Sequence, residues 1–111
     1  MSYSIGYSPE AYEDLRSIYN YIALDLLSAA NAKSQIKRLG KAIRGLDTFP
    51  EGHTRVDWEP WSSLGMRYLP VDNYIVYYLT DNESMTVLIV RVFYSGRDVK
   101  DIIQSDNNTK E

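Results

Sequence analysis

The sequence has no cysteine among its 111 residues, which excludes a disulfide framework and thiolate chemistry. This absence suits a reducing compartment, so we expect a cytoplasmic protein. No apolar run approaches the ~18–20 residues of a membrane-spanning helix, and we expect no membrane partner. The first residues, MSYSIGYSPEAYEDL, lack the basic and apolar segments of a signal peptide.

Positive charge is also scarce. Twelve lysines and arginines stand against 15 aspartates and glutamates, and the net charge is −3. This balance argues against broad, non-specific binding of nucleic acid. Ten tyrosines are present, and tyrosine covers a half-exposed sheet well because one end is apolar and the other forms hydrogen bonds.

The length fits one small domain, which we place at residues 1–104, with a polar tail at 105–111. Residues 2–7 alternate and predict a first strand. Ser8 then has the features of an N-cap, and the apolar spacing that follows predicts a helix over 9–26. A second helix is predicted from Ser28 to about Leu46, so the two helices form an antiparallel hairpin.

The second half predicts a long loop over 48–65 and then three strands in the segment 66–95. The turn residues VDN and DNES separate these strands, and Asp98 is expected to cap a short helix over 98–103. The fold class is therefore α+β with the order β-α-α-β-β-β. We expect an antiparallel sheet whose one face is covered by the helical hairpin and whose other face is open.

Alternation along the strands predicts which side chains share a face of the sheet. If Pro70 lies opposite Asn73, one face carries Met66, Tyr68, Ile75 and Tyr77. In the last strand, the uncharged set suits the helices better: Leu88, Val90, Val92 and Tyr94. Arg91 is then expected on the open face beside Tyr68 and Tyr77.

The arginines of this half have ordinary explanations as well. Arg67 falls on the helix face in this register, and a slip of one residue would move it to the open face. Arg97 follows the turn at Gly96 and is expected at the rim of the open face, where a pair with Asp98 or Asp101 is the alternative. A solvated side chain, or one stacked on a tyrosine, is an equally good interpretation of Arg91.

Four segments together resemble the RelE/ParE superfamily of bacterial toxins: YSPEAYEDLRSIYNYIA, AIRGLDTFPEG, EPWSSLGMRYLPVDNYIVYYL and VLIVRVFYSGRDV. The resemblance covers roughly residues 3–103. It implies the same architecture, a cognate antitoxin as partner, and a role as the toxin of a type II toxin–antitoxin system. Members of the superfamily either cleave mRNA on the ribosome or poison DNA gyrase, and a shared fold does not decide between them.

The first possibility is a metal-independent endoribonuclease that needs no cofactor and acts on mRNA bound to the ribosome. The resemblance matches Arg97 to a phosphate-binding arginine, with Arg91 and Arg67 as further candidates. Glu59 and His53 are candidate bases, and Tyr77 is a candidate proton donor. The candidates for stacking on RNA bases are Tyr68, Trp58 and Trp61. A packing role, in covering the sheet or filling the loop, accounts for these aromatic residues equally well.

Several family features are missing. The third-strand arginine position holds Ile75, the second-strand lysine positions fall near Met66 and Tyr68, and no terminal tyrosine or histidine is present. These gaps favour the second possibility, a gyrase inhibitor with no chemistry of its own. A third possibility is an inactive member that is retained as a binding partner. We favour the ribonuclease slightly, because the resemblance implies that superfamily members lacking the standard residues can still cut mRNA.

Overall fold

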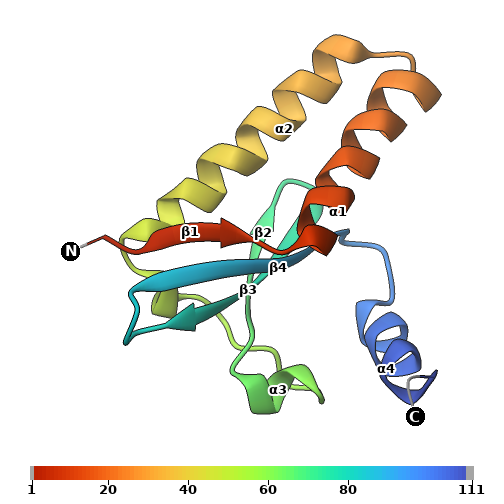
Figure 1. Ribbon diagram of the computed structural model, residues 1–111. Coiled ribbons are helices and arrows are strands. Elements are labelled where there is room, and N and C mark those ends of the chain that lie inside the picture. The colour runs from red at the N-terminus through yellow and green to blue at the C-terminus, as the bar shows by residue number, and fades with distance from the viewer. Residues whose placement is uncertain (1, 110–111) are drawn as a thin grey trace.

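The structure, a computed structural model, describes residues 2–109. A four-stranded sheet carries the hairpin of α1 (Pro9–Asn20) and α2 (Ala29–Arg44) on one side, while α3 (Trp61–Leu64) and α4 (Val99–Thr109) lie on the other (Figure 1). No helix in residues 2–109 is long and apolar enough to cross a membrane. The predicted α+β class and element order are confirmed.

The helical hairpin forms as its sequence predicts. The Ser8 hydroxyl accepts a hydrogen bond from the Ala11 N–H at 3.0 Å, which satisfies one of the free donors at the start of α1. A π-helical turn, Tyr21–Asp25, continues the first helix. Ser28 occupies the N-cap position of α2, but its side chain makes no capping hydrogen bond.

The sheet has the strand order β1-β4-β3-β2. β2 (Arg67–Val71), β3 (Tyr74–Asp81) and β4 (Thr86–Tyr94) form the predicted antiparallel meander. β1 (Ser4–Tyr7) pairs with β4 in parallel, so the sheet is mixed. A parallel neighbour requires a long crossover connection, which the hairpin and the β2–β3 pair supply.

The first core lies between the hairpin and the sheet. Ala11 of α1 and three residues at or just after α2, Leu39, Ile43 and Leu46, pack against Val76, Tyr78, Val87, Ile89 and Val92 of the sheet, and all of them are buried. Arg38 and Gln35 of α2 also reach the turn between β2 and β3, where Nε of Arg38 lies 2.8 Å from Oδ2 of Asp72. The hairpin is therefore fixed to the sheet by apolar packing and by this polar contact.

The other face of the sheet is not open, which corrects the sequence-based expectation. A second core covers it, formed by Val56, Trp61, Met66, Tyr77, Phe93 and Val99. The segment between α2 and β2 supplies Val56 and Trp61, and α4 supplies Val99. These segments show no clear periodicity in the sequence, so nothing in the alternation pattern predicted that they would cover a sheet.

A bulge in β4 changes which of its side chains face the helices. Tyr77 pairs with Arg91 and Tyr78 pairs with Ile89, so one extra residue, Val90, is inserted in β4. Val87 and Ile89 therefore belong to the first core, whereas Leu88 is exposed. The predicted faces of β4 are wrong on the N-terminal side of this bulge, because strict alternation assumes regular pairing. The β2–β3 register differs by two residues from the predicted one, with Pro70 opposite Ile75, and this shift preserves the faces.

Candidate functional site

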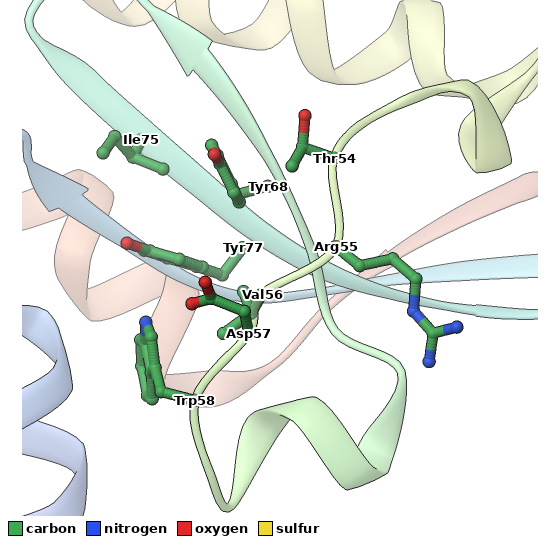
Figure 2. A pocket seen from close by; sticks show the side chains of 8 residues that line it. All are labelled: Thr54, Arg55, Val56, Asp57, Trp58, Tyr68, Ile75 and Tyr77. Carbon is green, nitrogen blue, oxygen red and sulfur yellow. The ribbon is translucent and has the colours of Figure 1, made fainter.

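A pocket of about 290 Å³ lies between the segment that precedes β2 and the sheet face opposite the hairpin. The strands contribute Tyr68, Ile75 and Tyr77, three residues that the alternation places on one face. The segment before α3 contributes Thr54, Arg55, Val56, Asp57 and Trp58. Figure 2 shows these eight side chains around the hollow.

Aromatic rings form much of this surface. The rings of Trp58 and Trp61 stack with centroids 5.0 Å apart, and Trp61 lies 4.8 Å from the ring of Tyr77. Tyr68 and Phe93 each lie 6.3 Å from Tyr77 on its other sides. Tyr77 is thus held by rings from three parts of the chain, and Trp58 and Tyr68 are the half-buried rings that reach the pocket.

The ionisation of Tyr77 limits its possible chemistry. Burial raises the pKa of Tyr77 above its ordinary value, and the neighbouring hydroxyl of Tyr68 raises it further. The Tyr77 hydroxyl therefore stays protonated at neutral pH. It can donate or accept a hydrogen bond, but it is a poor source of a proton for a leaving group.

The carboxylate of Glu59 is hydrogen-bonded within its own turn. It accepts hydrogen bonds from the Ser63 hydroxyl and from the Ser63 N–H, the latter at 2.7 Å. The Ser63 hydroxyl, followed by the Ser63 N–H, lowers the pKa of Glu59 below its ordinary value. A general base that acts near neutral pH needs a raised pKa, so this environment is the reverse of what base catalysis requires.

Arg91 lies opposite Tyr77 in the β3–β4 register, on the sheet face that the alternation predicts, but that face is covered and the guanidinium is paired with α1. Its Nε and Nη2 donate to the Asp14 carboxylate of α1 at 2.8 and 2.9 Å. The same carboxylate accepts from the Val92 N–H at 2.9 Å. Arg91 also lies over the Phe93 ring, 4.4 Å from its centroid. The arginine therefore joins β4 to α1.

Arg97 lies at a second hollow, a groove of about 910 Å³ between the hairpin, the start of β3 and the end of β4. Its guanidinium is 5.4 Å from the Phe93 ring centroid, and its side chain is exposed. A Cβ at Gly96 would lie 2.7 Å from the ring of Tyr94, so a larger residue at this position would displace that exposed ring. Asp98 accepts from the Asp101 N–H and caps α4, as the sequence predicts.

Arg67 and His53 lie near each other on the hairpin side of β2. Nη1 of Arg67 donates to the His53 carbonyl at 2.7 Å, and the His53 ring lies edge-on to Tyr78 at 6.3 Å. Arg67 pairs with Tyr78 in the sheet, so the predicted helix-side position of Arg67 is confirmed. The structure thus brings together Tyr68, Tyr77, Trp58 and Trp61, while Arg67 and Arg91 line neither hollow.

The pocket combines aromatic and polar side chains. No group of three or more His, Asp or Glu in the described part of the chain is placed to hold a metal ion. The pocket offers aromatic faces, hydroxyl groups and the Asp57 carboxylate, while the guanidinium of its remaining charged residue, Arg55, is directed away from the hollow in Figure 2. Sequence reasoning missed Asp57, although the letters DWEPW place it directly beside Trp58. It also missed Asp14 as the partner of Arg91, because 77 residues separate the two.

The family follows from a comparison with family models. Residues 5–99 match the ParE toxin of type II toxin–antitoxin systems, parDE. The chain belongs to the ParE toxin family. A comparison with curated protein sequences finds no match.

Solved structures of toxins share the fold of this ParE family member. The chromosomal ParDE system of P. aeruginosa has a TM-score of 0.69 at 18% identity, and the match covers 83% of this chain and 95% of that one. The RelBE2 toxin–antitoxin complex of Mycobacterium tuberculosis has a TM-score of 0.63 at 20% identity, with 85% and 92% covered. A mutant of the E. coli toxin RelE in the free state has a TM-score of 0.61 at 14% identity, with 94% and 93% covered. At these identities, the likeness shows the fold alone.

Proposed function

We propose that this toxin inhibits growth by binding a protein target, DNA gyrase, and does not cut RNA. The observation that carries the proposal is the make-up of the pocket. The positions where the resemblance to nucleases expects cations hold Tyr68 and Ile75 instead. The charged residues that line the pocket are Arg55 and Asp57, and Figure 2 shows the Arg55 guanidinium directed away from the hollow. A transferring phosphate needs positive charge directed at it, so this arrangement speaks against phosphate transfer in the pocket.

The other candidate catalytic groups support the same conclusion. Arg91 pairs with Asp14, and the pKa of Glu59 is lowered by Ser63. The raised pKa of Tyr77 makes it a weak acid. A metal-free nuclease needs a base, a proton donor and phosphate-binding cations at one place. Arg91 and Arg97 both lie over the Phe93 ring, which neighbours Tyr77, but the candidate bases lie elsewhere. Glu59 is hydrogen-bonded to Ser63 in the turn at α3, and His53 lies beside Arg67.

We also propose that a cognate antitoxin neutralises the toxin at the groove between the hairpin and the sheet. The groove is lined by apolar residues of the first helix and its π-helical turn, including Ile18, Ile22 and Leu26, and by Arg38 and Arg97. Leu24 and Leu27 at the tip of the hairpin are exposed. An amphipathic antitoxin segment with acidic side chains would match this combination, and it would gain its structure as it binds.

The test is to induce the toxin in cells that lack the antitoxin. Plasmid supercoiling and mRNA 5′ ends are then measured in the same culture over time, with antitoxin co-expression as the control. The expected result is altered supercoiling and early DNA damage while mRNA stays intact. Ribosome-phased cuts in mRNA with unchanged supercoiling would overturn the proposal in favour of the nuclease.

A further inference from the structure

The pocket of Figure 2 combines aromatic walls with hydrogen-bond acceptors. Trp58, Tyr68 and Tyr77 supply the ring surfaces. Oxygen atoms come from the Asp57 carboxylate, the Thr54 hydroxyl and the two tyrosine hydroxyls. A neutral hydroxyl can accept as well as donate a hydrogen bond, whereas the carboxylate only accepts. Each of these oxygen atoms can therefore accept a hydrogen bond from a group that enters the pocket.

The two charged residues that line the pocket, Arg55 and Asp57, direct their side chains differently. In Figure 2, the Asp57 carboxylate points toward Tyr77, whereas the Arg55 guanidinium points away from the hollow. Consistent with this, a Cβ at Gly65 would lie 3.7 Å from Nη2 of Arg55, which places the guanidinium beside the turn after α3. No residue among those described forms an ion pair or a hydrogen bond with the Asp57 carboxylate. The carboxylate is exposed and available.

We propose that this pocket binds an arginine side chain presented by a protein partner. A guanidinium carries five N–H donors and no acceptor, so it complements a pocket of acceptors. It is planar and stacks on aromatic rings, and a carboxylate can accept two of its hydrogen bonds at once. The volume of about 290 Å³ lies at the lower end of small-molecule sites, which suits a single side chain.

This inference goes beyond the proposed function, since it concerns a site on the toxin itself and holds whichever protein is the target. A nucleobase is the competing occupant, because rings stack on bases too. The nucleobase brings a phosphate with it in RNA, however, and the Asp57 carboxylate opposes that charge. The guanidinium is favoured by both the rings and the charge.

Tryptophan fluorescence can report binding at the pocket. Trp58 lines the pocket, Trp61 stacks on it, and the chain contains no other tryptophan. Intrinsic fluorescence of the purified full-length chain is titrated with N-acetyl-arginine amide, with its neutral citrulline analogue, and with adenosine monophosphate. We expect saturable quenching by the arginine probe and binding of the citrulline analogue that is weaker by about tenfold or more.

Two variants distinguish binding at the pocket from a non-specific effect of the protein's net charge. Asp57→Asn should weaken binding of the arginine probe about tenfold or more, because it removes a charge-assisted hydrogen bond from an exposed position that leaves folding intact. Glu83→Gln, a charge change on the exposed β3–β4 turn, is the matched control and should leave binding unchanged. Equal binding of arginine and citrulline, tighter binding of adenosine monophosphate, no saturable change, or an equal loss in both variants would each overturn the proposal.

A second titration identifies the source of the arginine. The preformed complex with the antitoxin is titrated with the same probe. Loss of probe binding assigns the arginine to the antitoxin, and retained binding assigns it to another protein partner. Both results uphold the site.

Discussion

Replacing Asp14 with alanine should destabilise the protein far more than replacing its neighbour Glu13. Asp14 accepts three hydrogen bonds, two from Arg91 and one from the Val92 N–H, all between 2.8 and 2.9 Å. The two side chains of the ion pair are only 22% and 13% exposed. Breaking a buried pair costs about 3–5 kcal/mol, so partial exposure brings the expected loss to roughly 2–3 kcal/mol.

Glu13 provides the matched control on the same helix. Its pair with Arg16 spans 3.6 Å, and both side chains are more than half exposed. Such pairs contribute about 0–0.5 kcal/mol. Each free energy of unfolding comes from urea denaturation followed by circular dichroism. In thermal melts, Asp14→Ala should lower Tm by on the order of 10 °C.

A double-mutant cycle with Arg91→Ala isolates the pair itself, because each single change also alters other contacts. We expect a coupling energy of about 1 kcal/mol or more. If Asp14→Ala and Glu13→Ala destabilise the protein equally, Arg91 is not held by α1. Its assignment as a structural rather than a phosphate-binding residue would then be refuted.

Three further results follow from the structure. Tyr78→Phe should cost about 1–2 kcal/mol, because the buried Tyr78 hydroxyl donates to the Pro50 carbonyl and its removal leaves that oxygen unpaired; chemical denaturation measures this. Ser63→Ala should raise the pKa of Glu59 toward its ordinary value, because the Ser63 hydroxyl stabilises the ionised carboxylate, which becomes protonated only when the pH falls through the lowered pKa. An NMR titration of Glu59 measures this pKa, and an unchanged value would contradict the assignment. Arg97→Ala should reduce toxicity in a growth assay while Tm changes by no more than a few degrees, because the guanidinium is exposed in the groove and its contact with the Phe93 ring contributes only about 0.5–1 kcal/mol; full toxicity would exclude a role for it.

The periodic segments of the chain were predictable. The spacing of apolar residues in the hairpin reports a helical face directly, and Ser8 caps the first helix as its position suggests. The face shared by Tyr68, Ile75 and Tyr77 was also predictable, because a register error of two residues leaves a strand's faces unchanged.

The remaining features of the fold and the site depend on contacts between distant parts of the chain, which a local sequence pattern does not predict. The bulge at Val90 shifts the alternation of β4 by one residue, and nothing in a run of β-branched residues marks it. The pairing of Arg91 with Asp14 arises only when β4 and α1 are packed together. The segment around Trp58 has no periodicity, so its position over the sheet, and the exposure of Asp57 at the pocket, required the structure.

Supercoiling of relaxed plasmid DNA by purified gyrase tests the central claim most directly. The full-length toxin is added to gyrase and, in a parallel reaction, to ribosomes that are translating a defined mRNA. We predict that the toxin inhibits supercoiling, that the antitoxin reverses this inhibition, and that the mRNA on the ribosomes stays intact. Unimpaired supercoiling together with cleavage of the mRNA in the ribosomal A site would contradict the account.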